Sequence, residues 1–228
     1  NNKISLNKKE NRDCKSLIND MKNISVKIKA LDNDLSEFNN SLNQKLMYIP
    51  NLVHKSVPDG SSDKDNKVIK EWGQKPSFNF KPLSHLDLCD SLNLVDFKRA
   101  AKISGSAFPL YVDQGAKLER SLINYMLDKH VVQNTYKEVF PPFLVTENSP
   151  LTTGNLPKFK EDMYYIENDG LYCIPTAEVP ITNFYANEVL SEDDLPKNFA
   201  AYSACFRREA GSYGKDTKGL HRLHQFNK

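Results

Sequence analysis

A single apolar stripe over residues 17–49 most constrains how this 228-residue chain can fold. The apolar residues recur in alternating steps of four and three, with one extra step of four near the end, which is the heptad spacing of paired helices. Pro50 then stops the helical pattern. Because so narrow a stripe cannot bury itself, the spacing predicts a helical arm over residues 1–49 that needs a partner helix. The stripe consists of Leu17, Met21, Ile24, Ile28, Leu31, Leu35, Phe38, Leu42, Leu46 and Ile49.

Positive charge gathers at one end of this arm. Residues 1–49 carry eight lysines and one arginine against six acidic residues. Phosphate contacts from such groups attract nucleic acid without reading its sequence. Two interpretations stay open from the residues alone: a coiled coil used for dimerisation, or an antiparallel two-helix arm that touches RNA. The basic residues near the expected bend are Lys3, Lys8, Lys9, Arg12 and Lys15.

Composition limits the classes of protein that fit. A net charge of +2 excludes a global polycation, so any nucleic-acid surface must be local. No apolar run approaches the ~20 residues of a membrane span. The four cysteines are scattered without CxxC spacing, which argues against a zinc site or a disulfide framework and favours a reducing compartment. We therefore expect a cytoplasmic protein with no membrane contact and no metal ligands.

Turn-rich and polar residues mark 50–70 as a linker between the arm and a larger domain over residues 71–228. Val68–Trp72 is the first strand candidate, and we expect the Trp72 side chain to be packed. Further along, an amphipathic helix is predicted over Gly115–His130, followed by a strand that runs into two prolines.

The triplet Thr176, Ala177 and Glu178 lies between two prolines that stiffen it. A rigid loop that presents a hydroxyl and a carboxylate suits a substrate bearing an ammonium group. The structural alternative is a helix start, with Thr176 as the N-cap and Glu178 near the positive end of the helix. Both interpretations can hold at once.

The run over residues 205–226 predicts a hairpin, because glycine-rich residues separate two extended stretches. Arg207 and Glu209 lie two apart on the outgoing stretch and would share a face, and Phe226 lies on the return stretch. A guanidinium binds phosphate oxygens, a carboxylate accepts from a base amine and a phenyl ring stacks on a purine. Taken singly, each is more often an ordinary surface residue than part of a site. His221 and His224 would lie on opposite faces, which argues against a metal site.

The string FRREAGSYGKDTKGLHRLHQF, residues 206–226, resembles motif 2 of class II aminoacyl-tRNA synthetases in the form found in seryl-tRNA synthetases. The run TGNLPKF at 153–159 and the Thr-Ala-Glu triplet are similar to the same family, and the helix–strand–proline order resembles motif 1. The resemblance extends over essentially the whole chain. It implies an α+β fold: an N-terminal antiparallel coiled-coil arm and a class II antiparallel β-sheet flanked by helices.

The resemblance also implies a function. Members activate L-serine with ATP and Mg²⁺ to seryl-adenylate and transfer serine to tRNA(Ser), with tRNA(Sec) as a further candidate; the arm grips the tRNA, and motif 1 forms a homodimer. The implied serine-binding residues are Thr176, Ala177 and Glu178. The implied ATP-binding residues are Arg207 at the α-phosphate, Glu209 at the adenine amine, Phe226 stacked under adenine, Arg208 and Leu223. The implied tRNA-binding residues are Lys8, Lys9, Arg12 and Lys15.

Family members continue past this point with a Glu that reads the serine hydroxyl and with motif 3, whose Arg clamps ATP. Neither lies within the 228 residues, so we expect an incomplete sheet, a longer protein and no activity from these residues alone. Two alternatives remain: a catalytically silent synthetase-like module that binds RNA or a partner, and a ligase that charges a carrier protein instead of tRNA.

Overall fold

The computed structural model describes residue 5, residues 13–209 and residues 219–228. Its contacts divide the chain into two units, Asn1–Asp65 and Asn66–Lys228. The finer division into an arm, a linker and a catalytic domain stays a prediction.

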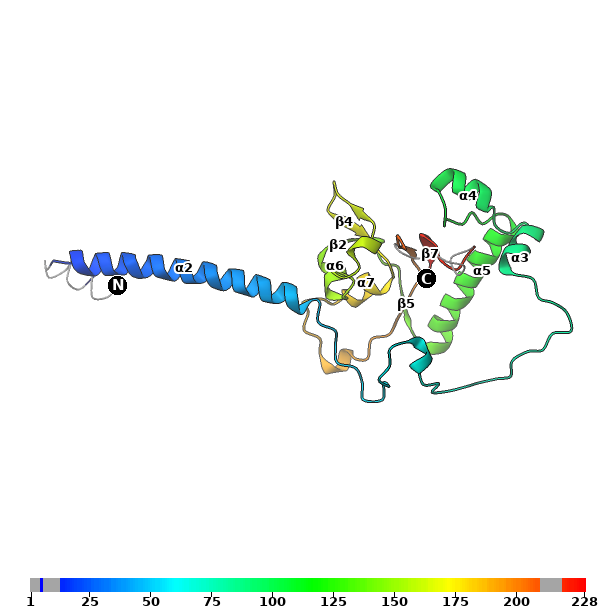
Figure 1. Cartoon of the computed structure of the whole chain (residues 1–228), viewed down its shortest axis with the longest axis horizontal. Coiled ribbons are helices and arrows are strands. Elements are labelled where there is room, and N and C mark those ends of the chain that lie inside the picture. The colour runs from blue at the N-terminus through cyan, green and yellow to red at the C-terminus, as the bar shows by residue number, and fades with distance from the viewer. Residues whose placement is uncertain (1–4, 6–12, 210–218) are drawn as a thin grey trace. The chain divides into compact units, whose positions relative to one another are not determined.

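The first unit is dominated by one long helix, α2 (Lys15–Leu46), drawn in blue in Figure 1. It buries none of its residues, and Phe38 on the apolar stripe is 74% exposed. The predicted helical arm is thus confirmed as a helix. The bend and the partner helix predicted near residues 1–12 fall almost wholly outside the described residues. A short 3-10 turn, η1 (Asp63–Asp65), ends this unit.

The second unit opens with residues 66–84, which form neither helix nor strand. The strand expected over Val68–Trp72 is therefore wrong, and so is the packed tryptophan, since Trp72 is 93% exposed. No described strand pairs with this run. A short apolar stretch forms a strand only when another strand accepts its hydrogen bonds.

Three helices follow, and side chains cap the first two at their N-termini. A capping box begins α3 (His85–Ser91), because Ser84 Oγ accepts from Asp87 N and Asp87 accepts in return from Ser84 N. Asp96 caps α4 (Phe97–Ser104) by accepting from Arg99 N at 2.8 Å. The predicted amphipathic helix is confirmed as α5 (Gln114–Asp128), which continues into a π-helical turn, η2 (Lys129–Gln133).

The described strands form three small sheets. β1 (Lys137–Val139) and β5 (Phe199–Ala201) are parallel, whereas the predicted sheet was antiparallel throughout. A long connection lets β5 return alongside β1 in the same direction, which a hairpin cannot do. β6 (Ala204–Phe206) and β7 (Gln225–Asn227) pair antiparallel, as the predicted hairpin requires.

The third sheet has the order β2-β4-β3 and carries the core. Its strands are β2 (Leu144–Thr146), β3 (Tyr165–Ile166) and β4 (Leu171–Cys173), all antiparallel. α6 (Asn148–Thr152) packs against β2, and α7 (Glu178–Thr182) packs against α6. Two 3-10 turns, η3 (Lys160–Asp162) and η4 (Glu192–Asp194), lie elsewhere along the chain of this unit. The predicted mixture of helices and sheet is confirmed. The buried cluster consists of Val145, Leu156, Met163, Tyr172, Ile174 and Val179.

Candidate functional site

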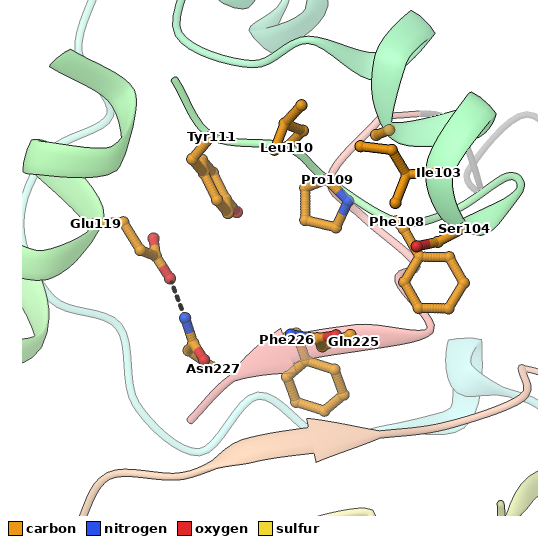
Figure 2. A pocket seen from close by; sticks show the side chains of 11 residues that line it. Ile103, Ser104, Phe108, Pro109, Leu110, Tyr111, Glu119, Gln225, Phe226 and Asn227 are labelled. Atoms are coloured by element: carbon orange, nitrogen blue, oxygen red, sulfur yellow. Dashed lines mark hydrogen bonds between the residues drawn. The ribbon is translucent and has the colours of Figure 1, made fainter. Parts of the chain in front are cut away.

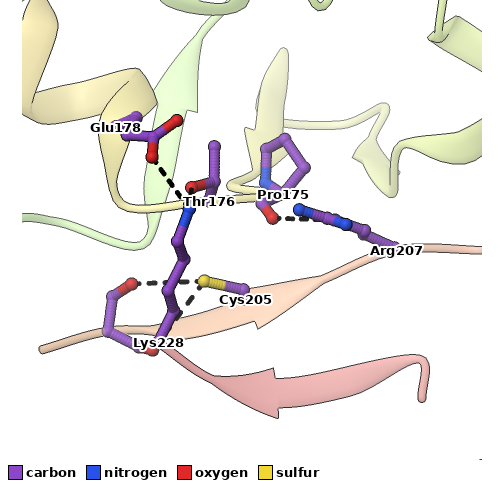
Figure 3. A network of polar contacts seen from close by, with 7 residues as sticks. Pro175, Thr176, Glu178, Cys205, Arg207 and Lys228 are labelled. Carbon is purple, nitrogen blue, oxygen red and sulfur yellow. Dashed lines mark hydrogen bonds and ion pairs between the residues drawn. The ribbon is translucent and has the colours of Figure 1, made fainter. Parts of the chain in front are cut away.

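The end of β6 meets the segment that follows β4. Phe206 N donates to Ile174 O at 2.8 Å, which joins the two segments through their backbones. One residue further on, Arg207 Nε donates to Pro175 O at 3.0 Å (Figure 3). The hairpin that resembles motif 2 therefore lies directly beside the loop that carries the Thr-Ala-Glu triplet.

Two side chains of this triplet converge on one nitrogen atom. Thr176 and Ala177 are buried, whereas the Glu178 side chain is 72% exposed. Lys228 Nζ donates to Thr176 Oγ1 at 2.8 Å and to Glu178 Oε1 at 2.9 Å. The hydroxyl and the carboxylate can thus hold a single ammonium group between them.

The alternative prediction, a helix start with Thr176 as the N-cap and Glu178 in the first turn, is correct only for Glu178. Glu178 does lie in the first turn of α7. Ala177, however, is the N-cap residue, and no side chain caps the helix. The Thr176 hydroxyl instead accepts from Lys228, so the cap predicted for Thr176 is wrong.

Arg207 and Glu209 line one cavity of about 320 Å³ together with Arg222. Arg222 Nη1 lies 3.2 Å from Glu209 Oε2, and the Glu209 side chain is only 17% exposed. Two guanidinium groups beside a nearly buried carboxylate can bind an anion and hold one hydrogen-bond acceptor in a fixed place. The rest of the wall consists of Asn155, Phe159, Asp162, Met163 and Pro175.

The prediction that Arg207 and Glu209 share one face of a strand was wrong, although both residues do line one cavity. β6 ends at Phe206, and Glu209 has a left-handed φ of 49°, so the two residues do not alternate along one strand. Arg207 still pairs across the hairpin, since its N donates to His224 O at 2.9 Å. The chain then turns, and the turn brings Glu209 to Arg222. The glycine-rich tip, residues 210–218, lies outside the described residues.

Phe226 belongs to the wall of another cavity. The Arg207 guanidinium carbon lies 5.0 Å from the Phe226 ring centre, a cation–π arrangement. Phe226 also lines a cavity of about 200 Å³ near Tyr111, and Asn227 Nδ2 donates to Glu119 Oε1 at 2.9 Å beside it (Figure 2). Burial and the nearby Glu119 carboxylate raise the pKa of Tyr111, so this tyrosine stays neutral near pH 7. The structure therefore does not bring Phe226 into the same cavity wall as Glu209.

The other predicted ATP-binding residues take separate positions. The Arg208 guanidinium carbon lies 5.2 Å from the Tyr164 ring centre, and Arg208 N donates to Asp162 O at 2.8 Å. Leu223 is 8% exposed and belongs to the buried part of the unit. Of the predicted tRNA-binding residues, Lys15 begins α2 and is exposed, whereas Lys8, Lys9 and Arg12 lie outside the described residues.

Sequence reasoning missed Lys228 and gave Arg222 no partner. Arg222 contacts Glu209 across the hairpin, and the charged pair itself is seen only in the folded chain. No local signal marks Lys228, because its partners Thr176 and Glu178 lie 52 and 50 positions earlier in the chain. Only the folded chain brings these three residues together.

Among the described residues, no group of three or more His, Cys, Asp or Glu side chains is arranged to hold a metal ion. Within the same residues, no helix has both the length and the apolar character needed to cross a membrane. Cys89, Cys173 and Cys205 carry free thiols.

Family models match both units of the chain. Residues 1–53 match the seryl-tRNA synthetase N-terminal domain, and residues 159–228 match the tRNA synthetase class II core domain of the G, H, P, S and T enzymes.

Curated relatives agree with these matches. The chain is 53% identical over 213 residues to a serine–tRNA ligase of Chloroherpeton thalassium, covering 93% of this chain and 50% of the relative. It is 50% identical over 225 residues to that of Syntrophobacter fumaroxidans, covering 99% and 53%. The chain thus spans about half the length of the curated relatives it matches.

Solved structures share the fold. A seryl-tRNA synthetase from Pyrococcus horikoshii, complexed with ATP, matches with a TM-score of 0.88 and 33% identity, covering 100% of this chain and 56% of that one. A cytoplasmic serine–tRNA ligase from Naegleria fowleri, in complex with AMP, matches with a TM-score of 0.78 and 27% identity, covering 90% and 49%. Since sequence and fold agree along its whole length, this chain belongs to the seryl-tRNA synthetase family.

Proposed function

We propose that this chain is part of a cytoplasmic serine–tRNA ligase, which joins L-serine to tRNA(Ser) at the expense of ATP. The observation that carries the proposal is identity of about 50% to serine–tRNA ligases over 93% to 99% of the chain. tRNA(Sec) is a second candidate acceptor for the same arm. The proposed division of labour assigns tRNA to residues 1–49, a linker to 50–70 and catalysis to 71–228.

The first step needs positioning more than proton transfer. The serine carboxylate is already ionised near pH 7, so its attack on the α-phosphorus of ATP needs no general base. The attack forms the acyl–phosphate bond, and pyrophosphate leaves with the electrons of the broken phosphoanhydride bond. Repulsion between the anions is the main barrier, and fixed positive charge lowers it.

Arg207 supplies that charge in the proposed complex. Its guanidinium would leave the Phe226 ring for the α-phosphate, which exposes the ring face to adenine. Glu209, held by Arg222 at 3.2 Å, would accept from the adenine amine. Leu223 would contribute backbone contacts and Arg208 further positive charge. Mg²⁺ would enter as part of the ATP substrate, since this ion is commonly bound through phosphates with few protein ligands.

The amino-acid pocket is proposed at Thr176, Ala177 and Glu178. The contacts to Lys228 Nζ support it, because the Thr176 hydroxyl and the Glu178 carboxylate already converge on an ammonium. A serine ammonium in that place would gain the same two partners. The serine carboxylate would then point toward Arg207, whose Nε donates a hydrogen bond to Pro175 O.

A homodimer through residues 115–142 completes the proposal. The apolar side chains Leu118, Leu122, Tyr125 and Met126 of α5 are between 46% and 63% exposed. A contiguous exposed apolar patch is typical of a protein interface. A second copy would cover it.

Serine-dependent exchange of pyrophosphate into ATP, followed by charging of tRNA(Ser) and tRNA(Sec), tests the function on the full-length protein. We expect exchange and charging with serine but not with alanine. tRNA binding without exchange would establish the catalytically silent module instead. Exchange without charging of either tRNA would favour a ligase that serves a carrier protein.

A further inference from the structure

An ammonium group already lies between the two side chains proposed to bind the ammonium of the substrate. Lys228 Nζ contacts Thr176 Oγ1 at 2.8 Å and Glu178 Oε1 at 2.9 Å (Figure 3). A primary ammonium on a lysine has the same charge and the same three donors as the α-ammonium of an amino acid. Lysine and substrate would therefore use the same two acceptors.

The backbone of Lys228 is fixed, so only its side chain needs to move. Lys228 N donates to Ser203 O at 3.0 Å, and Ser203 N donates to Lys228 O at 3.0 Å. Ser203 is completely buried, and the neighbouring pair Ala204 and Asn227 begins the β6–β7 ladder. This anchor keeps the ammonium within reach of the Thr-Ala-Glu loop whether or not the contact is made.

The contact itself is weak enough to exchange. The side chains of Lys228 and Glu178 are 45% and 72% exposed. Exposed ion pairs of this kind stabilise little, because water solvates both charges well. A ligand that brings its own ammonium, together with further contacts elsewhere in the site, can displace the lysine.

We propose that Lys228 is a resident competitor of the amino-acid site, whose ammonium occupies the substrate's ammonium position until substrate displaces it. The inference rests on the proposed function, since it takes Thr176 and Glu178 as the substrate's partners. When the competent state of a site is only partly populated, the apparent affinity falls by that fraction. Lys228 therefore lowers the affinity for serine and keeps the hydroxyl and the carboxylate arranged around a cation.

The test compares Lys228→Met with the wild-type full-length protein by titration calorimetry with L-serine. We expect serine to bind about two- to fivefold more tightly to the variant, the size of one exposed ion pair. Lys197→Met is the matched control, because Lys197 Nζ pairs with Asp194 at 3.5 Å in the same unit but outside the site. Its affinity for serine should equal that of the wild type.

A second ligand separates competition from a general effect of charge or folding. L-Glycerate replaces the amino group of serine with a hydroxyl, so it has no ammonium for Lys228 to oppose. We expect its affinity not to improve in Lys228→Met, so that the ratio of serine to glycerate affinity rises. A structural defect would weaken both ligands together.

The outcomes are distinct. Serine binding that is equal or weaker in Lys228→Met overturns the inference, and weaker binding would show that the lysine assists the substrate. A parallel gain for serine and glycerate also overturns it. Failure of the wild-type protein to bind serine while it binds ATP would overturn the proposed function itself.

Discussion

The arm and the β2-β4-β3 core differ in how much of their side-chain surface they bury and in how far apart in the sequence their contacts lie. α2 has 32 residues and buries none of them, whereas Ile174 and Val179 in the core are fully buried. The helix needs only hydrogen bonds between residues four apart, while the core joins Phe143, Ile174 and Phe206 from three distant segments. The arm is thus open to an outside partner, and the core fixes chemical groups in place. This contrast leads to four predictions.

The largest effect is expected at Arg207. Arg207→Ala should lower serine-dependent pyrophosphate exchange about a thousandfold, the scale of removing one group that stabilises transition-state charge. Binding of tRNA(Ser) and the oligomeric state should be unchanged, as measured by filter binding and by ultracentrifugation. Arg99→Ala is the control, because the Arg99 side chain on α4 is 78% exposed, pairs with the N-cap residue Asp96 and lines neither of the two cavities described above. Near-normal exchange in Arg207→Ala would refute the phosphate role.

The second prediction compares two apolar truncations. Ile174→Ala in the core should lower the free energy of unfolding by about 3 kcal/mol, through lost burial and a residual cavity. Leu35→Ala on α2, which is 58% exposed, should change it by no more than about 0.5 kcal/mol. Urea denaturation of the full-length protein measures both. A large loss for Leu35→Ala would show that a partner helix covers the stripe, and the contrast between the regions would shrink.

The third prediction concerns the arm as an RNA-binding surface. Lys15→Glu should weaken tRNA(Ser) binding about three- to tenfold and reduce the slope of log K against log salt by about one, as expected for one lost phosphate contact. Lys64→Glu in η1 is the control and should leave both quantities unchanged. Equal effects of the two substitutions would mean that net charge alone, and not the arm, governs binding.

The smallest effect is expected at the start of α4. The hydrogen bond from Arg99 N, and then the Arg99 side chain, lower the pKa of Asp96 below its usual value. A lowered folded-state pKa stabilises the protein above the unfolded pKa, and this stabilisation is lost as the pH falls through the folded pKa. Asp96→Asn should therefore melt slightly lower than wild type at pH 7, and the two should converge in acid. A constant difference at every pH would contradict the role of the charge.

The sequence predicted what depends on neighbouring residues. The stripe predicted α2, the apolar face of residues 115–130 predicted α5, and two extended runs predicted the β6–β7 hairpin. Placing the Thr-Ala-Glu triplet beside Arg207 rested on the family resemblance, because spacing alone cannot show which distant segments meet.

The features that the sequence did not predict correctly share one physical cause. The Val68–Trp72 run has strand-forming residues but no described partner strand, and the parallel pairing of β1 with β5 depends on a long connection. Glu209 reaches Arg222 through a left-handed backbone conformation that is rare for residues other than glycine. Lys228 contacts Glu178 across a separation of 50 positions in the sequence. Each of these outcomes is decided by tertiary contacts rather than by local preference.

The position of Arg207 on the Phe226 ring has a consequence for how the proposed enzyme would discriminate among nucleotides. The Arg207 guanidinium and a purine cannot occupy the same face of the Phe226 ring. Binding of the base would therefore require Arg207 to leave the ring and move toward the phosphate. Two contacts coupled in this way strengthen each other, and the coupling is reciprocal. Free pyrophosphate or a free nucleobase would make only one of these two contacts. Each would therefore bind more weakly than the intact nucleotide, which makes both.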